Sequence, residues 1–545
     1  MLLAAPPFNA WPLVLVAVLP LAWLLVRGTA RPWRDALLAM IGVVPMWVVW
    51  EWWTIDVTSL GFVPLVLVQS MWVPVFLLLA WRLQRRFPRV PLGLLVPVLW
   101  TAVEFFRGEL FLDGYAWGLL AHPLIALTAM ASPAALLGAY FVSFLVAAVN
   151  GALADLIFVP RRVGAGRAVL AACAAVWIAG AMSLPPIAPA APKVRPGIVQ
   201  TNVPQSNKTG WSIDDQLRDW RRFQELTREA ADSGGPQHHP DLVIWPETMV
   251  PGPTIEPSAV AELKQKGLYF TSESSGLKTS AYAFADSLDQ LQYEIDTPML
   301  VGAIGCEQFR VTENAKGRIR LDQKAKYNSV YMIDGGRVQN VRYDKVRLTP
   351  FGETMPYIRY WPWLQERMLQ FGAGGMAFDL DFGKNLTVFE VPAASLGHTV
   401  RVVTPICFEI TISGHCRDLV FDHGTRRAGL IVSVTNDGWF GNSDIDREQH
   451  LDAARWRAIE LATPVARAAN TGISAVIDAH GRLLARGVEG NPRGVRTDGV
   501  LTADVPLGTR TTLFARIGNV FPWSMLGLGV FALAGSFMRR KVRAD

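Results

Sequence analysis

The sequence predicts a polytopic α-helical membrane bundle joined to an α/β domain of layered helices and strands. Hydrophobic residues make up 51% of the 545-residue chain, and its 20 tryptophans suit membrane–water interfaces. The apolar residues gather before Pro185 and after Asn519, in segments that approach the roughly 20 residues needed to cross a bilayer. Between these blocks, short β-rich runs alternate with polar helical stretches, which is typical of a layered α/β domain.

Seven apolar segments are expected to form membrane helices. The shorter ones could instead be buried or re-entrant helices, above all the fourth, because it contains Glu104. The expected segments are Phe8–Val26, Ala36–Trp53, Phe62–Trp81, Val90–Phe106, Ala134–Val159, Ala168–Leu184 and Val520–Met538.

Charged residues alternate between the short loops of this bundle. Arginines follow the first, third, fifth and last segments, whereas the other loops carry mainly carboxylates. The positive-inside rule then places the N-terminus outside, the C-terminus inside and the α/β domain outside. The first segment is not a cleaved signal peptide, because it lacks a basic start and arginines follow it. We therefore expect a membrane domain over residues 1–186, an extracytoplasmic domain over 187–519, and a last helix with a basic cytoplasmic tail over 520–545.

The middle of the chain supplies the expected strands and helices. A stiff proline-rich linker, Pro185–Pro192, leads into it, and the polar stretch Gly267–Ile295 is expected to be a surface excursion within the domain. Helices are predicted over Gln216–Ala231 and Glu448–Ala462. The predicted strands are Gly197–Thr201, Leu242–Trp245, Met299–Gly305, Ser329–Ile333, Thr399–Pro405, Leu430–Thr435 and Ile473–Ile477.

Charge and cysteine usage exclude several classes of protein. The net charge of +6 is modest and its arginines lie in short loops, so no nucleic-acid partner is expected. Four cysteines are too few for a disulfide scaffold, and none of their spacings suits a metal, so no metal is expected. Cys173 is expected to be a packing residue. Cys306 and Cys416 are either inert core thiols or, less simply, a disulfide.

Three polar residues stand at the ends of apolar runs in the α/β domain. Glu247 ends the run Asp241-Leu-Val-Ile-Trp-Pro, Cys407 follows Val400-Arg-Val-Val-Thr-Pro-Ile, and Lys345 lies between them in sequence. A cysteine nucleophile needs a base or a nearby cation, because most of it is protonated at neutral pH. We expect Glu247 to take the thiol proton and Lys345 to stabilise the thiolate and then the oxyanion. Taken alone, Cys407 could be a small buried residue, Glu247 a carboxylate at a helix start and Lys345 a surface charge. The presence of all three at strand ends of one domain favours a Glu-Lys-Cys site.

Neighbouring groups are expected to support this site. The backbone N–H of Phe408 would be a second oxyanion donor if the chain turns sharply after Cys407. Glu353 lies eight residues beyond Lys345 and could orient that lysine or accept a proton, and Glu409 could do the same from the other side.

The motifs that carry these residues resemble the three signatures of the nitrilase superfamily. They are Trp245-Pro-Glu247, Lys345 with Pro350-Phe-Gly-Glu353, and Ile406-Cys407-Phe-Glu409. Flanking stretches narrow the resemblance to the bacterial apolipoprotein N-acyltransferases, over nearly the whole chain. Among these stretches are Tyr327-Asn-Ser329, Thr435-Asn-Asp-Gly-Trp-Phe-Gly441, Ala469-Asn-Thr-Gly-Ile-Ser474 and, in the membrane part, Leu99-Trp-Thr-Ala-Val-Glu104-Phe-Phe-Arg107-Gly.

The resemblance implies an αββα nitrilase-type sandwich on a multi-pass bundle in the bacterial inner membrane, with the catalytic domain on the periplasmic side. That family moves the sn-1 acyl chain of a phospholipid to the α-amino group of a diacylglyceryl-cysteine in an apolipoprotein. We thus expect a phospholipid donor, a diacylated apolipoprotein acceptor, contact with membrane lipid, no cofactor, and a monomer.

The resemblance also implies residue roles. By motif, Glu247 is the general base, Lys345 the oxyanion lysine and Cys407 the acylated nucleophile. The supporting residues would be Glu353, Glu409 and Asn328, and the substrate-binding aromatic residues Trp439 and, less directly, Trp211.

The chain departs from the family pattern in three places. Phe408 replaces the usual tyrosine, which removes a hydroxyl but keeps the backbone N–H. Six segments precede the catalytic domain instead of seven; either the first is absent or the start site lies further upstream. Extra residues displace the family's tryptophan to Trp211. An aromatic stretch, Tyr357–Trp363, is either part of a lipid entrance or a packing cluster.

Two other functions remain as alternatives at this stage. A membrane-anchored nitrilase-type amidase would share the three catalytic residues but has no need of six preceding helices. A transporter or scaffold with a binding-only external domain would show paired broken helices at the membrane midplane, which the segments lack.

Overall fold

The chain folds into two compact units in the computed structural model, which describes residues 1–57, 59–182, 191–205, 210–233, 239–272, 276–313, 319–372 and 380–538. One unit comprises Met1–Pro186 and Thr512–Asp545, the other Ile187–Thr511. The boundary thus falls before α18 (Leu513–Ile517) and not at Asn519 as predicted. Most of the predicted linker at 185–192 and the basic tail after residue 538 lie outside the described residues.

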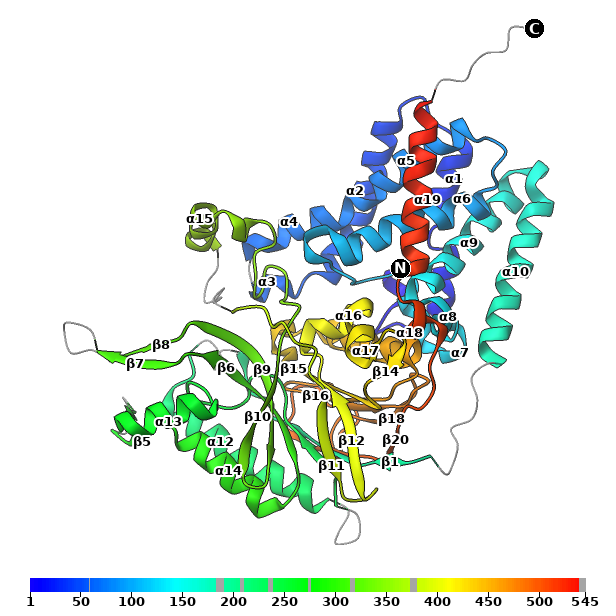
Figure 1. The fold of residues 1–545 in the computed structure, drawn as a ribbon. Helices are drawn as coiled ribbons and strands as arrows, with labels where there is room; N and C mark the ends of the chain where they lie inside the picture. The colour runs from blue at the N-terminus through cyan, green and yellow to red at the C-terminus, as the bar shows by residue number, and fades with distance from the viewer. Residues whose placement is uncertain are drawn as a thin grey trace. The chain divides into compact units, whose positions relative to one another are not determined.

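The first unit is an all-helical bundle (Figure 1). Within the described residues of this unit, five helical spans are long and apolar enough to cross a membrane: Pro32–Trp50, Gly61–Arg86, Ala139–Phe158, Pro160–Met182 and Val520–Phe537. Its α-helices are α1 (Leu19–Arg27), α2 (Pro32–Trp50), α3 (Thr54–Val57), α4 (Ser59–Ser70), α5 (Trp72–Arg86), α6 (Leu92–Phe105), α7 (Thr128–Ala131), α8 (Ala134–Leu137), α9 (Ala139–Phe158), α10 (Val163–Met182), α18, and α19 (Val520–Phe537).

The other two expected membrane segments form shorter helices. The first is divided into a 3-10 turn, Trp11–Val16, and α1, because Pro20 lacks the N–H needed to continue one helix. Asn150 of α9 satisfies backbone groups freed at this junction, with its Oδ1 2.8 Å from the Val18 nitrogen. The fourth, α6, has 14 residues, most of them buried, and packs against α9. A Cβ at Gly151 would collide with the Leu92 carbonyl oxygen, so the close approach of these helices requires glycine there.

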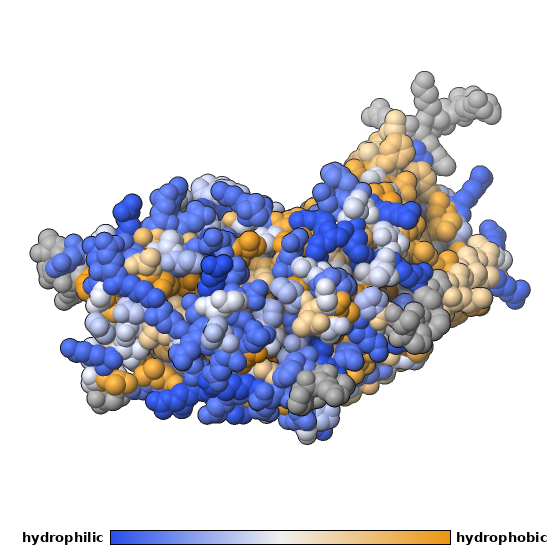
Figure 2. Space-filling view, turned by 60° about the horizontal axis from the view of Figure 1, so that its bottom comes forward, coloured by the Kyte–Doolittle hydropathy of each residue, from blue (hydrophilic) through white to orange (hydrophobic). Residues whose placement is uncertain are grey.

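Large apolar side chains cover the outside of this bundle. Trp33 is 75% exposed and Phe531 is 79% exposed, and similar residues recur along α2, α4 and α19. In Figure 2 the orange apolar side chains gather over the helical bundle, whereas the surface of the α/β unit in that view is mainly hydrophilic. An apolar exterior of this extent is the expected surface of a membrane-spanning bundle.

The second unit contains two six-stranded mixed sheets packed between layers of helices. In each sheet, three central strands run parallel and the outer strands are antiparallel. In spatial order, the first sheet is β10 (Arg337–Asp344), β9 (Ala325–Asp334), β6 (Met299–Glu307), β3 (Leu242–Ile244), β2 (Pro196–Gln200) and β19 (Gly499–Thr502). The second is β11 (Phe389–Ala393), β12 (His398–Val403), β15 (Leu430–Thr435), β16 (Val465–Ala469), β17 (Ala475–Ile477) and β18 (Leu483–Arg486).

Helices α12 (Ile213–Asp232) and α14 (Ala283–Ile295) pack on the first sheet, and α17 (Asp444–Leu461) packs on the second, beside α16 (Ser413–Val420). The first core is rich in aromatic rings: Trp245 contacts Trp220 edge-on at 5.5 Å between centroids. The remaining elements are α13 (Pro257–Lys266), α15 (Pro362–Gly372) and the two-stranded pairs β1 (Lys193–Val194) with β20 (Val505–Pro506), β4 (Tyr269–Thr271) with β5 (Lys278–Ser280), β7 (Arg310–Glu313) with β8 (Ile319–Asp322), and β13 (Phe421–Asp422) with β14 (Thr425–Arg426).

The prediction for 267–295 was wrong in its second half. Helix α14 buries Phe284, Leu288 and Leu291 in the core of the first sheet, so this stretch is not a surface excursion. The helical spacing of these apolar residues was obscured by the polar residues between them. All seven predicted strands and both predicted helices of this unit are present, with small shifts at their ends.

Candidate active site

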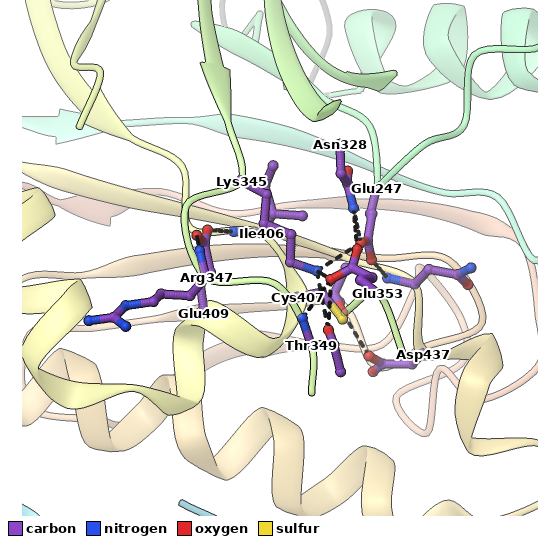
Figure 3. A network of polar contacts seen from close by, with 12 residues as sticks. Glu247, Asn328, Lys345, Arg347, Thr349, Glu353, Ile406, Cys407, Glu409 and Asp437 are labelled. Atoms are coloured by element: carbon purple, nitrogen blue, oxygen red, sulfur yellow. Dashed lines mark hydrogen bonds and ion pairs between the residues drawn. The ribbon is translucent and has the colours of Figure 1, made fainter. Parts of the chain in front are cut away.

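The three predicted catalytic residues lie beyond the ends of three strands. Glu247 follows β3, Lys345 follows β10 and Cys407 follows β12, where it opens the 3-10 helix Cys407–Thr411. Figure 3 shows their side chains pointing toward one another, together with Glu353. The fold therefore brings together residues separated by up to 160 positions in sequence.

Lys345 is a buried cation held between two carboxylates. The side chain is 1% exposed, and its Nζ lies 2.7 Å from Glu353 Oε2 and 3.5 Å from Glu247 Oε1. Burial by itself lowers the pKa of a lysine, but Glu353 and Glu247 raise the pKa of Lys345 above its ordinary value. The ammonium is therefore charged throughout the physiological pH range and presents its hydrogens inside the site.

Glu247 is held by donors on both of its oxygens. Asn328 Nδ2 donates to Oε1 at 2.6 Å, and the backbone N–H of Asn436 donates to Oε2 at 2.8 Å. The side chain is 4% exposed, so these bonds fix the carboxylate in one orientation. Asn328 therefore stands next to the predicted base, as expected from the motif.

Glu353 shares the same amide donor. Asn328 Nδ2 lies 3.0 Å from Glu353 Oε1, while the N–H and the hydroxyl of Thr349 donate to Oε2 at 2.8 and 2.9 Å. Burial opposes ionisation of Glu353, but the adjacent Lys345 ammonium outweighs it and lowers the carboxyl pKa. One cation and two carboxylates thus give the site an excess of negative charge.

Cys407 is a half-buried residue with an unusual backbone conformation. Its φ angle is +50°, in the left-handed region, which costs a non-glycine residue about 1–2 kcal/mol. Burial, and then the Glu247 carboxylate, raise the pKa of the thiol, against the opposing effects of Lys345 and a hydrogen bond with Thr435. The resting sulfur is therefore a thiol, and a base must remove its proton as it attacks.

The backbone after Cys407 offers a further donor. Phe408 is at the start of the 3-10 helix, where N–H groups have no intrahelical acceptor. The chain turns sharply at Cys407, as the proposed use of the Phe408 N–H as an oxyanion donor requires.

Glu409, expected to support the site, binds the loops on either side of it. Instead of the Lys345 ammonium, it contacts backbone: the N–H groups of Val346, Arg347 and Ile406 donate to its oxygens at 2.7, 2.8 and 2.8 Å. It is fully buried; burial opposes its ionisation, but His415 and these donors lower its pKa. Glu409 thus joins the loop after Lys345 to the loop that carries Cys407.

A pocket of about 570 Å³ is lined in part by the two carboxylates of the site, Glu247 and Glu353. Both predicted aromatic residues, Trp211 and Trp439, line it. Its walls are mainly apolar; besides these two they include Ile213, Val250, Phe270 and Leu380. A chamber of this kind suits a substrate with a hydrocarbon portion and a polar group at its reacting end.

Two family models account for most of the chain. Residues 1–152 match the apolipoprotein N-acyltransferase N-terminal domain, and residues 198–513 match the carbon-nitrogen hydrolase domain. The apolipoprotein N-acyltransferase of Shewanella oneidensis is 30% identical to this chain, over 82% of the chain and 74% of that protein. That of Geobacter metallireducens is 27% identical, over 99% and 94%. The chain belongs to the apolipoprotein N-acyltransferase family.

The first family model falls on the helical unit and the second on the α/β unit. The nitrilase-type αββα fold on a helical membrane part is therefore confirmed. Among solved structures, a mutant of the Nesterenkonia AN1 amidase of the nitrilase superfamily is similar, with a TM-score of 0.36 and 14% identity, over 58% of this chain and 93% of that one.

A buried polar cluster that the sequence did not indicate lies behind Cys407. Asp437, His450 and Arg467 are each 2% exposed or less. Arg467 Nη2 lies 2.6 Å from Asp437 Oδ2, and with burial opposing, this cation and His450 lower the pKa of Asp437 to about 2. Asp437 lies inside a motif that was noted as a resemblance only; no sequence signal connected His450 and Arg467 to it.

The remaining predictions concern an aromatic stretch and the cysteines. Within Tyr357–Trp363, Tyr360 is 69% exposed and Trp363 is 66% exposed, so this stretch is not a core cluster. Cys173, Cys306 and Cys416 are buried free thiols, which agrees with packing roles and excludes a disulfide between the last two in this structure.

Proposed function

We propose that this protein moves an acyl chain from a phospholipid, through a thioester on Cys407, to the α-amino group of a diacylglyceryl-cysteine in an apolipoprotein. Family membership supports the reaction class. The observation that carries the mechanism is the mainly apolar pocket whose lining includes the two carboxylates that contact Lys345. A buried ammonium, a fixed carboxylate and a thiol supply the cation, base and nucleophile that acyl transfer needs.

The first half-reaction forms the thioester. Glu247 takes the Cys407 proton as the sulfur attacks the ester carbonyl carbon of the phospholipid. The resulting oxyanion is stabilised by the Lys345 ammonium and the Phe408 N–H. The C–O bond to glycerol then breaks, and the glycerol alkoxide takes the proton from Glu247, which releases a lysophospholipid.

The second half-reaction consumes the thioester. The neutral α-amino group, whose ordinary pKa is about 8, attacks the thioester carbonyl carbon. Glu247 takes a proton from the nitrogen and returns it to the Cys407 sulfur as the C–S bond breaks. The same two oxyanion donors serve both steps, so one set of groups supports both substrates.

The supporting residues act on these three. Glu353 keeps Lys345 charged and in place, Asn328 bridges the two carboxylates, and Glu409 fixes the loop after Lys345. Trp211 and Trp439 are proposed to contact the acyl chain of the donor.

The membrane arrangement is a second part of the proposal. The arginine-rich loops support an N-terminus outside the cytoplasm, a C-terminus inside, and a catalytic unit on the periplasmic side of the inner membrane. A cysteine placed before Trp11 should react with an impermeant thiol reagent in cells with a permeabilised outer membrane, whereas one placed after Arg540 should not. The reverse pattern would overturn this orientation.

Steady-state kinetics test the proposed reaction. With a phospholipid and a diacylated lipopeptide as substrates, initial rates of N-acylation should give parallel double-reciprocal lines, because a lysophospholipid leaves before the amine reacts. Intersecting lines would indicate direct transfer. Release of free fatty acid at the same rate with and without lipopeptide would instead support the membrane-anchored amidase-type hydrolase.

A further inference from the structure

Hydrogen bonds reach Cys407 from two directions and meet at one buried carboxylate. His450, on α17, has its Nε2 3.2 Å from the carbonyl oxygen of Cys407 and its Nδ1 2.9 Å from Asp437 Oδ1. Thr435, at the end of β15, donates from its hydroxyl to the same Asp437 oxygen at 2.9 Å and is also hydrogen-bonded to the Cys407 side chain. Thr435, Asp437 and His450 therefore connect the sulfur of Cys407 to its own carbonyl group.

The hydrogen-bond roles of His450 follow from its partners. A carbonyl oxygen can only accept, so Nε2 carries a hydrogen and donates it to Cys407. On the other side, Nδ1 lies near an acceptor, Asp437, and near a donor, Arg467 Nη2, at 3.2 Å. Nδ1 therefore has a hydrogen-bond partner whether or not it carries a hydrogen. In both cases Nε2 carries a hydrogen that faces Cys407.

The carbonyl that His450 contacts belongs to a functional peptide group. Cys407 C=O and Phe408 N–H are the two ends of one planar unit, and in a trans peptide they point in opposite directions. Fixing the carbonyl toward His450 therefore fixes the direction of the N–H that the mechanism uses for the oxyanion. A carbonyl that accepts a hydrogen bond also makes the N–H of its peptide a stronger donor.

The local backbone needs such a restraint. Cys407 has φ +50°, and a non-glycine residue stays in that region only where its surroundings fix it. His450 is itself held rigidly: it is 2% exposed, and the Phe440 ring packs edge-on against it at 5.7 Å between centroids.

We propose that His450 is a positioning residue for the acylation chemistry, which holds the Cys407–Phe408 peptide so that its N–H faces the oxyanion. The inference rests on the proposed function. This role predicts that loss of the Nε2–H group slows thioester formation without weakening the binding of the phospholipid.

A matched pair of amide variants tests this role. In His450→Asn the shorter amide keeps a donor near Asp437 but cannot reach Cys407, whereas in His450→Gln the longer amide reaches it. The purified full-length protein in detergent would be mixed with a phospholipid, and the rate of acyl-enzyme formation followed by intact mass against donor concentration. His423→Asn, at a fully exposed histidine, is the control. Reaction of Cys407 with iodoacetamide, which forms no oxyanion, is measured in parallel.

The expected result separates positioning from packing. His450→Asn should lower the maximal acylation rate about 10- to 100-fold, with the half-saturating donor concentration and the iodoacetamide rate within about threefold of wild type. His450→Gln should recover at least about tenfold of the loss. If His450→Asn does not fold, His450→Met, which also lacks the donor, takes its place.

Equal acylation rates in the Asn and Gln variants, or a loss confined to donor affinity, would overturn the role of His450 while leaving the proposed function intact. Absence of any acyl adduct on the wild-type protein would overturn the proposed function, and this inference with it.

Discussion

The two six-stranded sheets contribute unlike halves of the candidate site. The first sheet and its loops supply the charged groups, Glu247, Lys345 and Glu353. The second supplies Cys407, with the backbone N–H groups that follow β12 and β15, at Phe408 and Asn436. Neither sheet alone carries both the proposed nucleophile and the proposed base. The chemistry therefore depends on how accurately the two sheets are held against each other.

Two of the contacts that join the sheets lie at the candidate site. From the second sheet, the Asn436 N–H donates to Glu247 of the first. Glu409, two residues after Cys407, accepts from the backbone N–H groups of Val346 and Arg347 immediately after Lys345. Both contacts involve an ionised carboxylate, for which hydrogen bonds are stronger than between neutral groups.

Removing the thiol supplied by the second sheet should have the largest effect. Cys407→Ala should abolish N-acylation of a diacylated lipopeptide, because no other described thiol lies in the site. The melting temperature in detergent should stay close to that of wild type, since alanine keeps the Cβ and the change removes only one sulfur atom. N-acylation by this variant above background would show that the reaction does not pass through Cys407.

Removing the buried cation supplied by the first sheet should lower both activity and stability. Lys345→Met leaves Glu353 and Glu247 buried without their cation, a change that typically destabilises a protein by about 3–5 kcal/mol. Loss of an oxyanion donor should also slow acylation by about 100- to 1,000-fold. Lys264→Met, which removes a half-exposed pair with Asp286, is the matched control and should change stability by less than about 1 kcal/mol. A Lys345→Met protein as stable as this control would contradict the burial argument.

Weakening the contact that Glu409 makes between the loops of the two sheets should have a smaller effect. Glu409→Gln replaces one acceptor oxygen by an NH₂ group that faces N–H donors, so we expect a loss of about 1–3 kcal/mol and slower acylation. Because the pKa of Glu409 is lowered in the fold, its stabilisation is present above the ordinary carboxyl range and is lost as pH falls through the folded-state pKa. The variant should therefore lose less stability than wild type on acidification. Thermal unfolding at several pH values measures this, with exposed Glu390→Gln as control.

The sequence predicted some strands of the two sheets but not others. Strands β3, β6 and β15 are mainly buried apolar runs and were predicted, and so was β12, in which buried and exposed residues are mixed. The positions of Glu247 and Cys407 after β3 and β12 agree with the prediction. Strand β10 was missed because it is largely polar, Arg337-Val-Gln-Asn-Val-Arg-Tyr-Asp344. Its place at the edge of the sheet explains that composition, since it has one paired neighbour and an exposed face.

The contacts between the halves could not be predicted. That Glu409 binds the backbone after Lys345, and that His450 contacts the Cys407 carbonyl, are results of tertiary packing between residues more than 40 positions apart. The sequence indicated Glu409 as a supporting carboxylate that could orient Lys345 or accept a proton, but it did not indicate the backbone groups that Glu409 binds. Sequence patterns locate groups at strand ends, but they do not state which donor each carboxylate will meet.

The pocket wall should contribute least. Trp211→Ala removes an apolar surface that lines the pocket, so it should raise the half-saturating concentration of a long-chain phospholipid by about 5- to 50-fold. The maximal acylation rate should change little. A donor with short acyl chains should be affected less than a long-chain one, and equal effects on both would argue against contact between Trp211 and the chain.

Intact mass spectrometry of the full-length protein tests the central claim most directly. Incubation with a phospholipid alone should add the mass of one acyl chain, and this adduct should be absent in Cys407→Ala and removable by neutral hydroxylamine, as for a thioester. Addition of a diacylated lipopeptide should remove the adduct and yield an equal amount of N-acylated peptide. N-acylated peptide without any adduct on Cys407, or loss of the acyl group to water before the peptide is added, would contradict the account.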